Sequence, residues 1–207
     1  MQGKFITMEG GEGAGKSTMM QRVGGWLEAA GHRVVVTREP GGTDLAEKLR
    51  EILLDRDNNT LSGQAELLLV FASRAQHLDE LIRPALARGD WVLCDRFTDA
   101  TWAYQGGGRG LPLDDIKTLE KLVHGDLSPD LTLLLDLPVE HGMRRAGERS
   151  EADRFEQESS TFFERVRNAY LERANSARGR FAIVDASPGV DEVWAQIEEI
   201  LSSRFNS

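Results

Sequence analysis

Apolar residues along the chain follow two alternating patterns, short continuous runs and longer segments with helical spacing. The short runs are typical of strands covered on both faces, and they span residues 4–9, 34–37, 91–95, 131–136 and 181–185. Between them, apolar residues recur every three or four positions, which predicts helices over 17–30, 44–54, 64–87, 113–123, from 139 onward, 156–177 and 190–205. The alternation predicts an α/β fold in which a five-stranded parallel sheet carries helices on both faces.

Polar and glycine-rich stretches mark the expected helix ends and connections. Asp44 and Glu47 have capping-box spacing, and Ser62 is predicted to cap the long helix over 64–87. Pro84 predicts a kink or a frayed end late in that helix. Residues 96–110 end in a run of glycines, so we expect a mobile polar loop there.

The composition narrows the class of protein. The 207 residues contain no internal repeat or linker, which predicts one domain over residues 1–207. A formal net charge of −9 argues against a nucleic-acid or anionic-membrane partner. The N-terminus has no apolar signal core, and no apolar run approaches the ~20 residues of a membrane helix. Cys94 alone cannot form an internal disulfide, so we expect a cytoplasmic protein.

A glycine-rich segment follows the first predicted strand and fits the pattern G-x-x-x-x-G-K-[ST]. Glycines let the backbone adopt positive φ and aim N–H groups at an anion, while Lys16 can reach β- and γ-phosphates and Ser17 can ligate Mg²⁺. A glycine turn with an incidental lysine is the alternative, but a strand before and a helix after favour phosphate binding. The predicted ATP-binding residues are Gly10, Gly11, Glu12, Gly13, Ala14, Gly15, Lys16, Ser17 and Thr18.

Other motifs distinguish the classes of protein that share this loop. The chain lacks the Asn-Lys-x-Asp segment with which GTPases read guanine. Residues 61–64, Leu-Ser-Gly-Gln, are one glycine short of the Leu-Ser-Gly-Gly-Gln segment of ABC-type ATPases. A small-molecule kinase is therefore favoured over a nucleotide-binding switch without enzymatic activity.

Acidic residues at strand ends supply candidates for the metal site. Asp95, Asp136 and Asp185 each end an apolar strand, and Asp95 is favoured because Arg96 follows it. A carboxylate for Mg²⁺ beside a guanidinium for phosphate suits phosphoryl transfer. Asp136 and Asp185 fit a turn cap better. The arginines of residues 144–151 fit equally a closing lid over the site or a solvated face of paired charges.

Several segments together resemble bacterial thymidylate kinase over the whole chain. They span residues 9–17, 37–43, 71–74, 95–97, 103–110, 129–132 and 153–156. The most specific are Arg-Glu-Pro-Gly-Gly-Thr at 38–43 and the tyrosine-glutamine-glycine segment that begins at Tyr104. The resemblance implies a three-layer P-loop NTPase fold with a short arginine-bearing lid at approximately 142–154, a homodimer, and phosphorylation of dTMP to dTDP with ATP and Mg²⁺.

The resemblance also implies roles for individual residues. The acceptor dTMP would contact Glu12, Arg38, Phe71, Arg74, Arg96, Thr101, Tyr104 and Gln105. Among these, Phe71 would stack on thymine and Arg74 would donate a hydrogen bond to it, whereas Arg96 would hold the acceptor phosphate. On helical spacing alone, Phe71 is better explained as a core residue. Ser17, Asp95 and Glu9 would arrange Mg²⁺, directly or through water.

The resemblance assigns the catalytic work to Lys16, Arg96, Arg145, Arg149 and Glu12. Residues 12–14 of the phosphate loop contain no arginine, so Arg145 and Arg149 of the lid would stabilise the transferred group. Gly147 stands between them where close bacterial relatives often have another arginine. The alternative function is a kinase of the same fold that acts on another nucleoside monophosphate or on a nucleoside.

Overall fold

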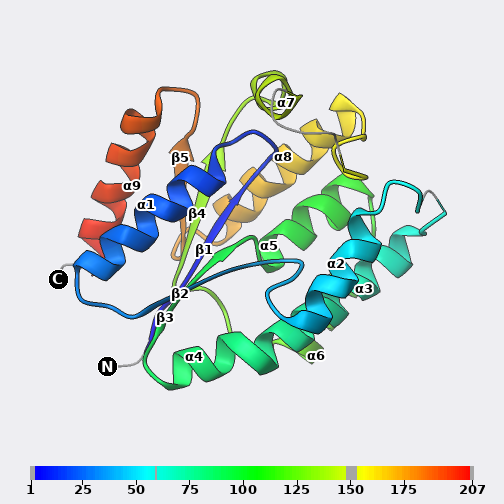
Figure 1. Ribbon diagram of the computed structural model, residues 1–207. Helices are drawn as coiled ribbons and strands as arrows, with labels where there is room; N and C mark the ends of the chain where they lie inside the picture. Colours follow the sequence, from blue (N-terminus) through cyan, green and yellow to red (C-terminus); the bar gives the residue numbers. More distant parts are fainter. Residues whose placement is uncertain (1–2, 59, 148–152, 206–207) are drawn as a thin grey trace.

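The computed structural model describes residues 3–58, 60–147 and 153–205. Its centre is a parallel sheet of five strands in the order β2-β3-β1-β4-β5 (Figure 1). The strands are β1 (Phe5–Gly10), β2 (Val34–Arg38), β3 (Trp91–Asp95), β4 (Leu131–Asp136) and β5 (Phe181–Asp185). All five predicted strands are confirmed, with ends that differ by at most one residue.

Helices cover both faces of the sheet, which makes three layers. Alternate side chains of β1 enter different cores: Ile6 packs with α1 (Lys16–Ala29) and α9 (Val190–Phe205), while Phe5 packs on the opposite face (Figure 1). The other helices include α2 (Asp44–Leu54), α6 (Leu113–Val123), α7 (Val139–Gly147) and α8 (Ser160–Ser176). Burial on both faces explains why β1, β3 and β4 are continuously apolar, whereas the edge strands β2 and β5 are partly exposed. No helix in the described ranges is both long and apolar enough to cross a membrane.

The long helix predicted over 64–87 is one helical segment with a change of geometry. It consists of α3 (Gly63–His77), the π-helical turn η1 (Leu78–Ile82) and α4 (Arg83–Ala87). Pro84 cannot donate a backbone hydrogen bond, and its ring crowds the preceding turn, so a widened turn just before it is physically reasonable. The predicted cap at Ser62 is confirmed, since its Oγ accepts from the Ala65 N–H at 3.2 Å.

Two predicted helix starts are wrong. Thr43, not Asp44, caps α2, and its Oγ1 accepts from the Ala46 N–H at 3.4 Å. The helix predicted to start at residue 156 begins at Ser160, because residues 153–158 form turns held by the Asp153 carboxylate. At each start an N-cap hydroxyl accepts from the first turn of the helix, Thr43 for α2 and Ser159 for α8, and apolar spacing does not show which residue does so.

The segment predicted as a mobile loop over 96–110 is helical, and this prediction is wrong. It forms α5 (Thr98–Thr101) and the π-helical η2 (Trp102–Gly108), and most of η2 is buried. A Cβ on Gly107 would lie 2.5 Å from the Ala169 Cβ, and one on Gly108 would lie 2.5 Å from the Phe162 ring. These glycines therefore allow α8 to approach η2 closely, and they do not indicate flexibility here.

Candidate active site

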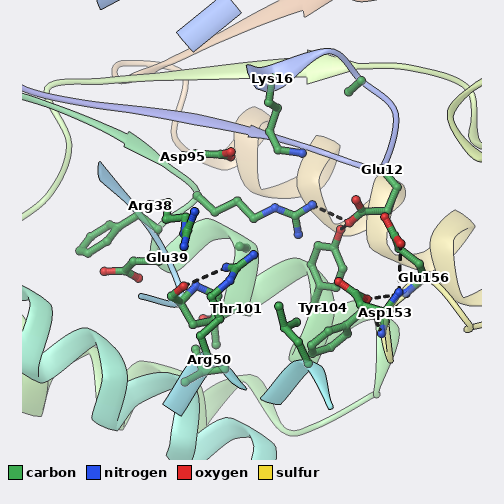
Figure 2. A pocket seen from close by; sticks show the side chains of 18 of the residues that line it. Glu12, Lys16, Arg38, Glu39, Arg50, Asp95, Thr101, Tyr104, Asp153 and Glu156 are labelled. Carbon is green, nitrogen blue, oxygen red and sulfur yellow. Dashed lines mark hydrogen bonds and ion pairs between the residues drawn. The ribbon is translucent and has the colours of Figure 1, made fainter. Parts of the chain in front are cut away.

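A cavity of about 300 Å³ lies at the carboxyl ends of β1, β2 and β3, the position expected for ligands of such sheets. Lys16 and Asp95 lie at its phosphate-loop end, and Glu39 and Thr101 lie at the other end (Figure 2). The predicted residues Glu12, Gly13, Ala14, Gly15, Lys16, Ser17, Arg38, Arg74, Asp95, Arg96, Thr101, Tyr104 and Gln105 all line it. Residues from distant parts of the sequence are thus gathered around one space.

The phosphate loop connects β1 to α1 with the geometry that its motif predicts. Gly13 and Gly15 have φ of 68° and 85°, and no side chain caps the start of α1. The first N–H groups of α1 can therefore donate to a bound anion, because no capping side chain competes for them. Lys16 Nζ donates to the carbonyls of Gly10 at 3.2 Å and Gly11 at 3.1 Å, and burial lowers its pKa. Thr18 is exposed and does not line the cavity.

Glu12 joins the phosphate loop to the opposite wall of the cavity. Its Oε1 accepts from Arg96 Nη2 at 2.6 Å and from the Tyr104 hydroxyl at 2.8 Å (Figure 2). Burial alone would raise the pKa of Glu12, but Arg96, Lys16 and the Tyr104 hydrogen bond lower it to about 2. Glu12 is therefore ionised and held in one place.

Arg96 is fixed by its backbone as well as by its side chain. Its φ of 68° is the one left-handed value of a non-glycine residue in the described ranges. The guanidinium lies 4.7 Å from the centre of the Tyr104 ring, in cation–π contact. Strained backbone of this kind is common at functional sites, and here it directs a cation toward the cavity.

Arg74 is a buried cation held by a carboxylate. Its Nε donates to Glu39 Oε2 at 2.7 Å, and its Nη2 donates to Thr101 Oγ1 at 2.9 Å. Arg74 and His77 together hold the pKa of Glu39 below its ordinary value despite burial. Arg74 Nη1 is buried and has no hydrogen-bond partner among the described residues. One donor thus remains available in a side chain that lines the cavity.

Phe71 occupies a different position from the other predicted acceptor residues. It is buried with Leu67 and Ile116, and the Arg74 guanidinium lies 4.8 Å from its ring centre. Phe71 is not among the residues that line the cavity. This placement agrees with the core role that helical spacing favoured, and stacking on a base stays a prediction.

Asp95 is the strand-end carboxylate that fits a metal ion. Its Oδ1 is buried without a partner among the residues described, and it lines the cavity with Ser17. A carboxylate and a hydroxyl suit Mg²⁺, which takes few protein ligands and completes its shell with phosphates and water. No cluster of three or more His, Cys, Asp or Glu side chains suited to a metal occurs in the described ranges. The residues present therefore fit Mg²⁺ held together with a nucleotide.

Glu9 lies behind the cavity and does not line it. Its Oε1 accepts from the Phe97 N–H at 2.7 Å, and its Oε2 contacts the Tyr170 hydroxyl at 2.8 Å. Burial, with a smaller contribution from Asp99, raises the pKa of Glu9 to about 8. Both carboxyl oxygens already have hydrogen-bond partners, and a pKa of about 8 favours the protonated form at pH 7. Glu9 is therefore better suited to holding the backbone at Phe97 in place than to binding a metal ion directly.

The predicted lid arginines are only partly described. Arg145 donates to the carbonyls of Ala186 at 3.2 Å and Ser187 at 3.3 Å, and it does not line the cavity. Arg149 lies outside the described residues, as do the other residues of 148–152 in the predicted lid. Arg38 lines the cavity and pairs with Glu47 at 2.9 Å.

The other two strand-end aspartates have structural partners. Asp136 forms a bidentate pair with Arg167, at 2.7 and 2.9 Å. Asp185 accepts from the Ser187 N–H at 2.9 Å, which is the turn cap that its sequence favoured. The structure thus separates three aspartates that look alike in sequence by what each one contacts.

Some cavity residues were not predicted. Arg50, Asp153 and Glu156 line the cavity (Figure 2), and Arg50 donates to the Pro40 carbonyl at 2.9 Å. Arg50 belongs to an ordinary charged helix face, so nothing in the pattern distinguishes it. Glu39 lies inside the specific Arg-Glu-Pro-Gly-Gly-Thr segment, and that segment was the signal that could have identified it.

Comparison with known proteins identifies the family of the chain. Residues 8–197 match the family model described as "Thymidylate kinase". Proteins named thymidylate kinase from Pseudomonas savastanoi pv. phaseolicola and Alcanivorax borkumensis are each 57% identical over 201 residues, which is 97% of this chain and 96% and 97% of theirs. A crystal structure of thymidylate kinase from Ehrlichia chaffeensis superposes with a TM-score of 0.79 at 31% identity, covering 98% of this chain and 99% of that one. The chain is therefore an enzyme of the kinase class, and it belongs to the thymidylate kinase family.

Proposed function

We propose that the chain transfers the γ-phosphoryl group of ATP to dTMP in the presence of Mg²⁺, with dTDP as the product. The observation that carries this proposal is the Glu12–Arg96 contact, because the phosphate loop and Arg96, which we propose as the cation for the acceptor, line two walls of one cavity. A donor phosphate on the loop and an acceptor phosphate at Arg96 would then face each other across that cavity, as in-line transfer requires.

The acceptor oxygen of a phosphate monoester is already anionic, so the transfer needs no general base. Catalysis then consists of positioning and of neutralising charge. Lys16 would exchange its two carbonyl contacts for the β- and γ-phosphates, and the start of α1 would add N–H donors. Bound Mg²⁺ would neutralise further phosphate charge, with Asp95 and Ser17 to hold it.

Arg145 and Arg149 are proposed to stabilise the transferred group. In the structure Arg145 binds two carbonyls between β5 and α9, so it must leave them to reach the phosphates. Both contacts are hydrogen bonds to neutral acceptors, which a guanidinium gives up readily for a phosphate. The phosphate loop offers no arginine that could substitute.

The opposite end of the cavity is suited to a thymine base. The unpartnered Nη1 of Arg74 is a donor for a base carbonyl, and Thr101 and Glu39 fix the guanidinium that carries it. The Tyr104 ring lies under Arg96, and its hydroxyl is committed to Glu12. We propose that this ring fills the space beside the acceptor sugar and so disfavours a ribose 2′-hydroxyl.

A homodimer is proposed from the family resemblance and from one apolar surface. Leu45 and Ile52 of α2, Leu68 of α3, and Leu113 and Leu122 of α6 are exposed. These helices lie on the same side of the molecule (Figure 1), and Leu122 is 77% exposed. Exposed apolar side chains in such number favour an interface. Sedimentation of the wild type and of Leu68→Glu would test this proposal. We expect the wild type to sediment as a dimer and Leu68→Glu to sediment as a monomer.

The decisive experiment measures ADP release across a panel of acceptors: dTMP, dUMP, dCMP, dGMP and thymidine. The highest kcat/KM is expected with dTMP. Lys16→Ala should lower turnover by roughly a thousandfold or more, since it removes a cation that acts on the transferred group. A higher kcat/KM with another acceptor would establish the alternative kinase, and hydrolysis of ATP without any phosphorylated acceptor would revive a nucleotide-binding switch.

A further inference from the structure

Glu66, in the first turn of α3, is a fully buried carboxylate that contacts three different side chains. Its Oε1 accepts from Gln105 Nε2 at 2.8 Å and from Arg109 Nε at 3.2 Å. Its Oε2 accepts from Arg154 Nη2 at 2.6 Å and from Arg109 Nη2 at 3.1 Å. Of these partners Gln105 lines the cavity, whereas Arg109 and Arg154 do not. Glu66 therefore reaches the site through Gln105.

The chemistry of this contact fixes the orientation of the Gln105 amide. A carboxylate can only accept hydrogen bonds, whereas an amide has a donor end and an acceptor end. With the amide reversed, its oxygen would face the oxygen of Glu66, and two acceptors would repel each other. The nitrogen must therefore point to Glu66 and the Oε1 must point away from it. That Oε1 makes no hydrogen bond to any residue in the described ranges.

Glu66 is itself unable to turn away. Rotation would leave Arg154, which is only 9% exposed, without its carboxylate, and it would leave Arg109 with Glu158 alone. Arg154 Nε is further bound to the Leu53 carbonyl at 2.8 Å, and its guanidinium lies 4.6 Å from the Phe155 ring centre. The loss of either ion pair inside the protein is costly, so the network holds Glu66 and, through it, the Gln105 amide.

We propose that Glu66 is a positioning residue for base recognition, which turns the Gln105 amide so that its oxygen is the group offered to the nucleobase. This inference rests on the proposed function. Thymine and uracil present an N3–H donor beside a carbonyl, which complements the Gln105 oxygen and the available N–H of Arg74. Cytosine presents an N3 acceptor beside an amino donor, the reversed pattern. Glu66 thereby favours imide bases over cytosine although it touches neither.

The test replaces Glu66 by Gln, whose amide can donate as well as accept and so no longer dictates the orientation of Gln105. Dissociation constants for dTMP, dUMP and dCMP are measured by calorimetry, with KM for ATP alongside. The ratio of dCMP to dTMP dissociation constants is expected to fall about tenfold, the value of one oriented hydrogen bond. The ratio of dUMP to dTMP should stay unchanged, because both bases present the same imide edge, and KM for ATP should move less than twofold.

Two further variants show whether the effect passes through Gln105. Glu158→Gln removes the other carboxylate that pairs with Arg109 without contact to Gln105, so the dCMP to dTMP ratio should equal that of the wild type. In a Gln105→Leu background, Glu66→Gln should leave the ratio unchanged. If Glu66→Gln does not fold, Glu66→Asp keeps a charge for both arginines while it withdraws the carboxylate from Gln105, and the same fall is expected.

A folded Glu66 variant with the wild-type dCMP to dTMP ratio would overturn the inference, and so would a dUMP to dTMP ratio that changes as much as the dCMP to dTMP ratio. These outcomes leave the proposed function intact, since the wild type would still phosphorylate dTMP. A wild type that binds dCMP as tightly as dTMP and phosphorylates neither would instead overturn the proposed function itself.

Discussion

Gly142 of α7 lies directly against the backbone of Glu12 in the phosphate loop. A Cβ at Gly142 would lie 2.3 Å from the Glu12 carbonyl oxygen, and a Cβ at Gly13 would lie 2.1 Å from the Gly142 carbonyl oxygen. Helix α7 and the phosphate loop thus touch backbone to backbone, with two facing glycines that leave no room for a side chain. The shape of the loop depends on this contact.

Gly142→Ala should therefore push the phosphate loop away from α7. We expect KM for ATP to rise at least about tenfold and the free energy of unfolding to fall by about 1–3 kcal/mol, as for an overpacked core. Gly147→Ala, in the same helix, is the matched control, since its Cβ would meet nothing within 4 Å. ATP kinetics and thermal melts of both variants measure this. Equal KM values in the two variants would show that the loop tolerates the displacement.

The neutral carboxyl of Glu9 should make stability depend on pH. Its pKa of about 8 lies above the ordinary value of 4.5, so between these values the folded protein holds a proton that the unfolded chain has lost. The free energy of unfolding should thus decrease as the pH rises from 4.5 to 8, by at most about 1.4 kcal/mol per unit from this group. Glu9→Gln imitates the neutral form and should flatten this dependence in melts at pH 5.5 and 8. Glu198→Gln, at an exposed position, should keep the wild-type slope; a Glu9→Gln variant that also keeps it would contradict the assignment.

Asp95 should determine the Mg²⁺ requirement. Asp95→Asn is expected to raise the Mg²⁺ concentration for half-maximal turnover at least about tenfold, because it removes a charged ligand whose buried oxygen has no described protein partner. Asp136→Asn is the control at another strand end: it weakens the pair with Arg167 but should leave the Mg²⁺ requirement unchanged. Titrations of Mg²⁺ at saturating ATP and dTMP separate the two variants. Identical titration curves would place the metal elsewhere.

Arg74→Ala should separate binding of the acceptor from binding of the donor. Loss of the guanidinium removes a donor from the cavity, so KM for dTMP should rise roughly a hundredfold while KM for ATP stays within about twofold. Glu39 would remain buried without its cation, which should cost about 3–5 kcal/mol of stability. Arg83→Ala removes an exposed pair with Asp79 and should cost less than about 1 kcal/mol. A normal KM for dTMP in folded Arg74→Ala would exclude this residue from the base site.

The sheet was predictable because β1, β3 and β4 are buried on both faces, so their apolar runs stand out from the helices around them, and the edge strands β2 and β5 keep short β-branched runs although they are partly exposed. Residues 96–110 were not, because Gly107 and Gly108 in sequence look like a flexible tip. Their actual role is to let Ala169 and Phe162 approach, and such an approach between segments about sixty residues apart leaves no local pattern. Secondary-structure propensity reflects only the residues near a position in sequence. It does not reflect a helix from elsewhere in the chain that packs against that position.

Site residues that belong to a recognisable motif could be predicted from the sequence. Residues whose role depends on contacts with distant parts of the chain could not. The phosphate loop, Arg96 and Asp95 follow from spacing and from strand ends. Glu66 looks in sequence like one acid on a helix surface, and its two arginines come from 43 and 88 residues away. Arg145 likewise looks like a lid cation, yet in the structure it donates to two backbone carbonyls.

The carboxylate of Glu12 has a thermodynamic consequence for the order of events at the site. It belongs to the phosphate loop, yet Arg96 and Tyr104 on the opposite wall of the cavity hold it. On the proposed function, an acceptor phosphate that binds Arg96 would compete with Glu12 for it, so its arrival would change the electrostatic field and the freedom of the phosphate loop. Linkage makes such an effect reciprocal: whatever factor the acceptor imposes on the affinity for ATP, ATP imposes on the affinity for the acceptor. On the proposed function, the two substrates would therefore not bind independently, because the carboxylate of Glu12 is shared between their sites.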